Sequence, residues 1–193
     1  MRKSLIVISG PSGAGKTTVI KKLLQDRELK DKILFSVSHT TRKKREGEKE
    51  GEDYFFVSEK EFREMIQKGE FLEWAEVHGN LYGTHKNNVE KAEEENKILL
   101  LDIDVQGAEK IRQKMREKAV FVFIRPSSVD ELKKRLISRG DTPEKEIEKR
   151  IKDAQKEIEE ENKFDFVVIN DKLEHAFEKL KEIVKKVISE NQK

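Results

Sequence analysis

The residues that most constrain this chain form a short glycine-rich turn between an apolar segment and an amphipathic one. Residues 5–8 are all apolar, and the sequence GPSGAGKT follows at residues 10–17. Glycine leaves room for backbone N–H groups to converge on one point, and a helix that begins near Lys16 would add the positive end of its dipole. A strand, a glycine-rich turn and a helix in this order are typical of the phosphate-binding P-loop. An ordinary tight turn that caps a helix is the alternative.

The P-loop motif predicts a role for individual residues. Lys16 is expected to reach the β- and γ-phosphates of a nucleotide, and the Thr17 hydroxyl is expected to ligate Mg²⁺. The motif therefore predicts a bound nucleotide, with Mg²⁺ as the cofactor. The residues of this segment that are predicted to bind the nucleotide are Gly10, Pro11, Ser12, Gly13, Ala14, Gly15, Lys16, Thr17 and Thr18.

Length and composition set broad limits on what surrounds this loop. The 193 residues suffice for one α/β domain, and 41 Lys and Arg against 39 Asp and Glu leave a net charge of +2. Because the two signs nearly cancel, we expect neither a nucleic acid nor an anionic membrane as a partner. The chain has no cysteine and no segment typical of a signal peptide or a membrane span, so we expect a cytoplasmic protein.

Apolar runs alternate with helical periodicities along the rest of the chain. Strands that are separated by helices predict an α/β fold of three layers, in which a mostly parallel sheet carries helices on both faces. A hairpin is predicted over residues 70–84. Strand candidates begin at residues 4, 32, 97, 119 and 164. In the last helix the residues expected to face the core are Leu173, Phe177, Leu180, Val184 and Val187.

Two polar segments interrupt this alternation, at about residues 37–84 and 126–160. We expect both as insertions over the carboxyl edge of the sheet, where folds of this class bind ligands. Asp102 and Asp104 follow four apolar residues at that edge. We interpret them as an indirect Mg²⁺ contact and as acceptor contacts, with ordinary solvation of a strand end as the alternative. The P-loop alone does not choose between a hydrolysing switch, a motor and a phosphotransferase.

Further motifs, spread over nearly the whole chain, narrow this choice. They are GPSGAGKTT, FSVSHTTRKKREGE, DYFFVS, FLEWAEVHGNLYGT, LLLDIDVQG and LKKRLISRG. In their order and spacing the chain resembles the guanylate kinases. The resemblance implies transfer of the γ-phosphoryl group of ATP to GMP with Mg²⁺, which yields ADP and GDP.

The resemblance also implies a division of the chain, residues 1–193, within a single P-loop domain. An inserted α+β subdomain of about residues 37–84 would bind GMP, and a helical lid of about residues 126–160 would close over the phosphates. The P-loop core would comprise about residues 1–36, 85–125 and 161–193.

The acceptor side needs donors for a phosphate that carries close to two negative charges. Arg42 and Arg45 are suited to this, because a guanidinium offers planar, multidentate donors. The hydroxyls of Tyr54 and Tyr82 add two more donors. The resemblance assigns the GMP phosphate to these four residues. From the sequence alone, Arg42 and Arg45 fit equally well in a solvated basic run.

Recognition of the base needs an acceptor, because guanine presents N1–H and N2–H₂ side by side. In a regular strand Glu73 shares a face with Phe71, Ala75 and Val77, so its carboxylate would lie in an apolar row. An edge strand that leaves Glu73 in water is the alternative. The resemblance assigns guanine to Glu73. The further GMP contacts that it implies are Ser38, Thr84, Asp102 and Asp104.

Arginines of the second polar segment are candidates to bring positive charge to the phosphates after the nucleotides have bound. Arg135 and Arg139 are four residues apart and share one helical face, and Arg150 lies in the next predicted helix. The resemblance implies that these arginines stabilise the charge of the transferring phosphoryl group, together with Lys16 and Arg42 as the catalytic set. Surface charge on an exposed helix is the alternative for each of them.

The resemblance places Asn170 near the adenine of ATP. We expect no general base, because the acceptor oxygen is already anionic.

Other functions stay open. A kinase for another nucleoside monophosphate would share the P-loop and lid but not Glu73 with Ser38. A non-catalytic guanylate-kinase-like binding module would carry a degraded P-loop, whereas Lys16 and Thr17 are intact. We expect ATP and GMP, and also dGMP, as small-molecule partners of a monomer or a homodimer.

Overall fold

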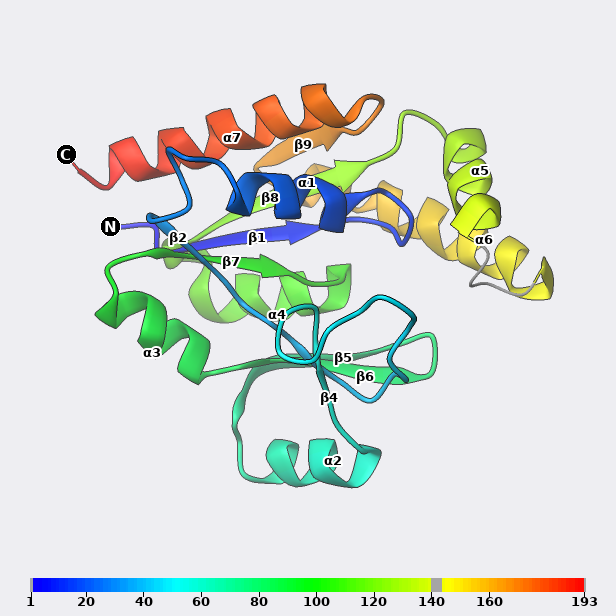
Figure 1. The fold of residues 1–193 in the computed structure, drawn as a ribbon, viewed down its shortest axis with the longest axis horizontal. Coiled ribbons are helices and arrows are strands. Elements are labelled where there is room, and N and C mark those ends of the chain that lie inside the picture. Colours follow the sequence, from blue (N-terminus) through cyan, green and yellow to red (C-terminus); the bar gives the residue numbers. More distant parts are fainter. Residues whose placement is uncertain (1, 140–143, 193) are drawn as a thin grey trace.

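The computed structural model describes residues 2–139 and 144–192 and contains two sheets in these ranges (Figure 1). The larger sheet is entirely parallel. Its strands, in spatial order, are β2 (Ile33–Phe35), β7 (Ile98–Asp102), β1 (Leu5–Ser9), β8 (Ala119–Arg125) and β9 (Phe166–Ile169). The smaller sheet is mixed and follows the order β4 (Phe55–Phe56), β3 (His39–Thr40), β6 (Asn80–His85) and β5 (Phe71–Val77).

Helices cover the two faces of the larger sheet, namely α1 (Lys16–Leu24) and α7 (Leu173–Glu190) on one face and α3 (Asn87–Glu94) and α4 (Val105–Met115) on the other (Figure 1). Helix α2 (Glu59–Gln67) packs on the smaller sheet, and α5 (Val129–Arg139) packs on α6 (Glu144–Glu159). Two short 3₁₀ turns are η1 (Arg116–Lys118) and η2 (Glu161–Lys163). Among the helices in the described ranges, none has both the length and the apolar composition that a membrane crossing requires.

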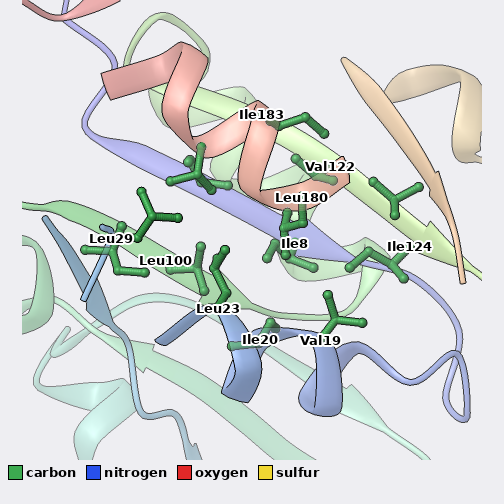
Figure 2. Packing of buried hydrophobic residues seen from close by; sticks show 14 of the residues in the cluster. Ile8, Val19, Ile20, Leu23, Leu29, Leu100, Val122, Ile124, Leu180 and Ile183 are labelled. Atoms are coloured by element: carbon green, nitrogen blue, oxygen red, sulfur yellow. The ribbon is translucent and has the colours of Figure 1, made fainter. Parts of the chain in front are cut away.

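Strand β1 is buried on both faces and separates two hydrophobic clusters. Ile6 and Ile8 belong to the cluster that α1 and α7 cover, which Figure 2 shows from close by. Leu5 and Val7 belong to the cluster on the opposite face, where α4 packs. Alternate residues of a strand point to opposite faces, so a continuous apolar run is what a parallel sheet between two helical layers requires. The predicted α/β fold is confirmed.

Two local predictions need correction. Leu173 does not face the core but is 37 % exposed, because it is the first residue of α7 and the helix packs on the sheet only from Ala176 onward. Helix α3 is absent from the sequence-based prediction. Only Val89 and Ala92 of its eight residues pack against a core cluster, so its apolar periodicity is too weak to detect. The predicted hairpin of β5 and β6 is confirmed.

The smaller sheet and the α5–α6 pair each have an apolar core of their own. Phe62 of α2, Phe71 of β5 and Leu81 of β6 form the first. Leu132 and Leu136 of α5 pack on α6 in the second. Figure 1 shows α5 and α6 beyond the carboxyl ends of the parallel strands. The division into core, GMP-binding subdomain and lid stays a prediction.

A polar row joins α4 to β5, the edge strand of the smaller sheet. Residues four apart on α4 donate side-chain hydrogen bonds to backbone carbonyls of alternate β5 residues, in the pairs Gln106 with Glu76, Lys110 with Trp74 and Lys114 with Leu72. The rows match because four helical residues advance by about 6 Å and two strand residues by about 6.6 Å. The row satisfies carbonyls that an open sheet edge leaves unpaired, and it holds β5 along the length of α4.

Candidate active site

A cavity of about 930 Å³ opens at the carboxyl edge of the larger sheet. Its walls come from the P-loop, the smaller sheet and the α5–α6 pair, so the structure brings together residues that lie far apart in the sequence. The predicted site residues that line it are Gly10, Ser12, Gly13, Gly15, Lys16, Thr17, Thr18, Ser38, Arg42, Arg45, Tyr54, Glu73, Tyr82, Asp102, Asp104, Arg135 and Arg150.

Four of the remaining predicted residues do not line the cavity. Pro11, Ala14, Thr84 and Asn170 are buried behind its wall. Arg139 is the last residue of α5, and its side chain lies outside the part of the chain that the structure describes. The roles of all these residues stay predictions.

The P-loop is packed so tightly that glycine is required at two positions. Gly10 has a φ of +139°, and a Cβ atom there would lie 1.9 Å from the carbonyl oxygen of Ile124 in β8. Gly15 has a φ of +83°, and a Cβ would lie 2.3 Å from Nδ2 of Asn170. Gly15 is also the N-cap of α1, and no side chain caps this helix end. The first N–H groups of α1 are therefore available to an anion.

Lys16 and two distant residues bind the backbone of the P-loop. Lys16 Nζ donates to the carbonyl oxygens of Gly10 at 2.6 Å and Pro11 at 3.3 Å. Asn170 Nδ2 and Arg135 Nη1 donate to the carbonyl oxygen of Ala14, at 2.7 Å and 3.3 Å. Arg135 Nη2 also donates to the carbonyl oxygen of Asn170 at 2.8 Å. Helix α5 is thus joined directly to the loop that is predicted to hold the phosphates.

On the opposite wall, Glu73 is a buried carboxylate. It is 4 % exposed, so although β5 is an edge strand, the alternative that leaves Glu73 in water is wrong. Thr84 Oγ1 donates to Glu73 Oε1 at 2.7 Å. Burial, with a smaller contribution from the negative charge of Asp104, raises the pKa of Glu73 to about 7. A carboxyl group with one protein donor in an apolar row retains acceptor capacity for a ligand.

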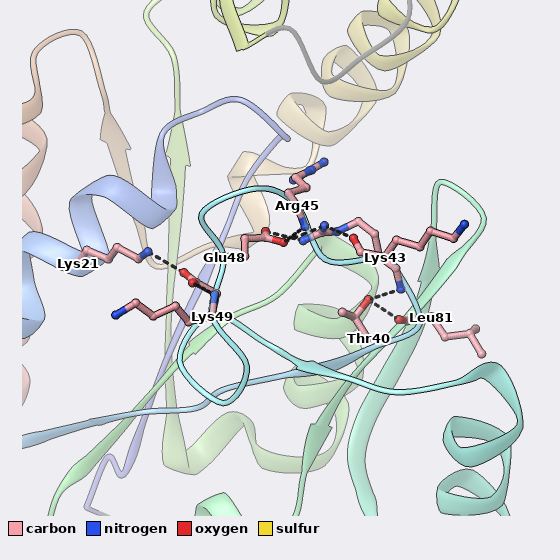
Figure 3. Close-up of polar contacts among 9 residues, drawn as sticks. Lys21, Thr40, Lys43, Arg45, Glu48, Lys49 and Leu81 are labelled. Atoms are coloured by element: carbon pink, nitrogen blue, oxygen red, sulfur yellow. Dashed lines mark hydrogen bonds and ion pairs between the residues drawn. The ribbon is translucent and has the colours of Figure 1, made fainter.

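A basic and aromatic cluster lies between these two walls. The Cζ atom of Arg42 is 5.3 Å from the ring centre of Tyr54, whose ring centre is 5.9 Å from that of Tyr82. Burial, followed by the charge of Asp102, raises the pKa of the Tyr54 hydroxyl, so it stays a hydrogen-bond donor at neutral pH. Arg42 also forms an ion pair with Glu48 in the loop that Figure 3 shows. Arg42 is therefore not part of a solvated basic run.

Comparison with known proteins agrees with this geometry. The family model for guanylate kinase matches residues 2–187. The chain belongs to the guanylate kinase family. It is 47% identical to a guanylate kinase of Campylobacter jejuni over 95% of this chain and 89% of that protein. It is 45% identical to one of Thermotoga maritima over 96% and 87%. The crystal structure of guanylate kinase from Anaplasma phagocytophilum superposes with a TM-score of 0.79, at 36% identity, and covers 100% of this chain and 88% of that one.

The predicted Mg²⁺ site of this guanylate kinase fold requires oxygen ligands that face the same cavity. Thr17 and Asp102 line the same cavity, and burial raises the pKa of Asp102 while the charge of Lys16 lowers it. Across residues 2–139 and 144–192, no group of three or more His, Cys, Asp or Glu residues would hold a metal by itself. Mg²⁺ binds through one or two protein oxygens plus substrate phosphates, so these two residues suit it.

Sequence reasoning missed three residues of the site. Glu48 stands within a quoted motif, but nothing in the motif says which side chain it contacts. Glu157 of α6 lines the cavity, and burial raises its pKa to about 7, with Lys16 opposing this rise and Asp104 adding to it. Gly107 of α4 packs against Glu73. For Glu157 and Gly107 no local pattern gives a signal, because both act through contacts with distant segments.

Gly107 yields a direct test of the wall that holds Glu73. A Cβ at this position, in the first turn of α4, would lie 2.6 Å from Glu73 Oε2. We expect Gly107→Ala to displace the carboxylate and raise the KM for GMP about tenfold, with the KM for ATP unchanged. Steady-state kinetics with each substrate varied in turn measures this. An unchanged KM for GMP would contradict the contact, and Ala108→Gly serves as a control for altered helix propensity.

Proposed function

We propose that this protein transfers the γ-phosphoryl group of ATP to GMP, in keeping with its family. The observation that carries the proposal is the pairing of two sites in one cavity: the P-loop on one wall, and on the other a buried Glu73 beside Arg42, Tyr54 and Tyr82. A hydrolysing switch or a motor does not need a buried carboxylate that accepts hydrogen bonds from the nucleobase of a second nucleotide. A phosphotransferase that discriminates between bases requires one.

On the donor side, the backbone does most of the binding. We propose that the uncapped N–H groups of α1 and the glycine-bearing loop hold the ATP phosphates, and that Lys16 exchanges its contacts with Gly10 and Pro11 for phosphate oxygens. Thr17 and Asp102 would hold Mg²⁺, the latter through water. The ion would supply Lewis-acid neutralisation of charge on the phosphates. Asn170 would contribute near the adenine.

On the acceptor side, the site supplies orientation and charge. Arg42, Arg45, Tyr54 and Tyr82 would grip the phosphate of GMP, while Glu73 accepts the N1–H and N2–H₂ groups of guanine. Further contacts with GMP would come from Ser38, Thr84, Asp102 and Asp104. Because the attacking oxygen is already anionic, alignment and electrostatic stabilisation carry the reaction without a general base.

Helices α5 and α6 would act as the lid. Arg135 and Arg150 line the cavity, and we propose that they, with Arg139, stabilise negative charge on the transferring group. Within the described part of the chain, the ion pair of Arg150 with Glu146 is loose, at 3.9 Å, so Arg150 can turn toward a nucleotide at small cost. Closure of the lid and of the GMP-binding subdomain would exclude water and limit ATP hydrolysis.

An acceptor panel tests the proposed function. ADP formation from ATP is measured in a coupled assay with GMP, dGMP, AMP, UMP, CMP or dTMP. We expect kcat/KM for GMP to exceed that for AMP by about 10³-fold or more, because adenine offers no N1–H donor and leaves Glu73 unpaired. A preference for another monophosphate would make the protein a different kinase. ADP formation that is independent of any acceptor indicates an ATPase, and no ADP formation indicates a binding module.

A further inference from the structure

The loop between β3 and β4 contains a carboxylate, Glu48, that has no part in the proposed reaction so far. Its oxygens accept hydrogen bonds from both terminal nitrogens of Arg42, at 2.7 Å from Nη2 and 3.1 Å from Nη1. The two side chains are only 12% and 17% exposed, and both line the cavity. Water therefore screens this pair less than an ion pair on the open surface, and its two-pronged geometry fixes the plane of the guanidinium.

The same carboxylate closes the turn that carries Arg45. Glu48 Oε2 accepts a hydrogen bond from the backbone N–H of Arg45 at 2.8 Å, and the backbone N–H of Glu48 donates to the carbonyl oxygen of Arg45 at 3.2 Å. Figure 3 shows Glu48 pointing toward the base of Arg45 within this loop. One side chain thus holds Arg42 by its guanidinium and Arg45 by its backbone.

These contacts do not use all the donors of Arg42. A guanidinium has five N–H groups, of which Glu48 takes two and the carbonyl oxygen of Lys43, 2.8 Å from Nη1, takes a third. A carboxylate bound across Nη1 and Nη2 leaves the edge formed by Nε and Nη2. Arg42 also shares a hydrogen bond with the hydroxyl of Tyr82, which is itself a predicted phosphate contact, so a phosphate is able to bind both side chains without the release of Glu48.

We infer that Glu48 is a positioning residue, which presets Arg42 and Arg45 for the phosphate of a nucleoside monophosphate. The inference rests on the proposed function. Because the guanidinium is already fixed before the substrate arrives, binding loses less side-chain freedom than it would with a mobile arginine. A carboxylate that merely occupied the place of the phosphate would behave in the opposite way, since its removal would strengthen binding.

The test compares Glu48→Gln with Glu46→Gln, which removes the same charge from an exposed position of the same cavity two residues away. Binding of GMP and of guanosine, which lacks the phosphate, is measured by titration calorimetry. For Glu48→Gln we expect the Kd of GMP to rise about tenfold while the Kd of guanosine changes less than about twofold. The KM for GMP should rise in parallel, with kcat within about threefold and the KM for ATP unchanged. Glu46→Gln should leave all these values as they are.

Three outcomes would overturn the inference. GMP binding that is unchanged or tighter in Glu48→Gln excludes a positioning role. Equal weakening of GMP and guanosine means that the variant has damaged the subdomain as a whole. An equal effect of Glu46→Gln means that the negative charge of the loop, and not the contacts of Glu48, determines the affinity for GMP. Failure of the proposed function is seen separately, because the unaltered protein would then neither bind GMP nor form ADP with it.

Discussion

Replacing Lys16 by methionine is expected to lower kcat by about 10³-fold and to leave the protein folded. Methionine keeps the length and apolar body of the side chain but removes the positive charge, which is the feature that a transferring phosphoryl group requires. Lys16 Nζ lies at the cavity wall, where it donates to the carbonyl oxygens of Gly10 and Pro11. Loss of one charged donor from a preorganised site costs about 10²–10³ in kcat, and the lysine also binds in the ground state.

The measurement is the initial rate of ADP formation with both substrates saturating, together with thermal unfolding. Lys22→Met is the matched control, because Lys22 lies on the same helix but forms an ion pair with Glu174 away from the cavity. It should retain kcat within about twofold. A Lys16→Met variant with kcat within tenfold of the unaltered protein would refute the proposed role of this residue. A large loss of thermal stability would instead indicate that the lysine mainly holds the loop.

Replacing Glu73 by glutamine is expected to lower kcat/KM for GMP by about 10³-fold while the KM for ATP stays within about twofold. The amide keeps the volume of the side chain, but it places an NH₂ group where guanine presents its own donors. A site built to accept hydrogen bonds rejects a mismatched partner strongly, because the buried groups are left unpaired. Glu64→Gln, on the exposed face of α2, is the control for charge alone. Unchanged GMP kinetics would remove Glu73 from its proposed role.

Glu73 also predicts a dependence on pH. Because the pKa of this buried carboxyl is about 7, protonation below that pH removes an acceptor, and kcat/KM for GMP should fall with decreasing pH in the unaltered protein. Stability should move the other way. The folded pKa lies above the ordinary value of 4.5, so protonation stabilises the free protein below about pH 4.5, and this stabilisation is lost as pH rises toward 7. Glu157 adds a similar dependence, so the difference between Glu73→Gln and the unaltered protein isolates Glu73.

Local patterns were sufficient for the strands of the larger sheet and for the donor side of the site. The P-loop is a continuous segment in which the glycines and the lysine that contact one another are close in the sequence. Each buried strand is predicted by its own run of apolar residues. The capping box of Ser58 and Glu61 at the start of α2 is local in the same sense, because its two side chains are only three residues apart in the sequence. Helix α3 and the exposure of Leu173 escaped because each depends on what the segment packs against.

The acceptor side was decided by the tertiary structure. The pKa of Glu73 rises mainly because the fold buries its carboxyl group, and the charge of Asp104, which precedes α4, adds to the rise. Gly107 of α4 packs against the same carboxylate. Tertiary contacts also support the P-loop, since Asn170 and Ala14 are 156 residues apart in the chain and a side-chain hydrogen bond of 2.7 Å joins them. A sequence states which groups a chain possesses, whereas burial and pairing across segments set the charge and the direction of those groups. That physical distinction separates the phosphate loop, readable from adjacent residues, from the acceptor wall, which exists only in the folded molecule.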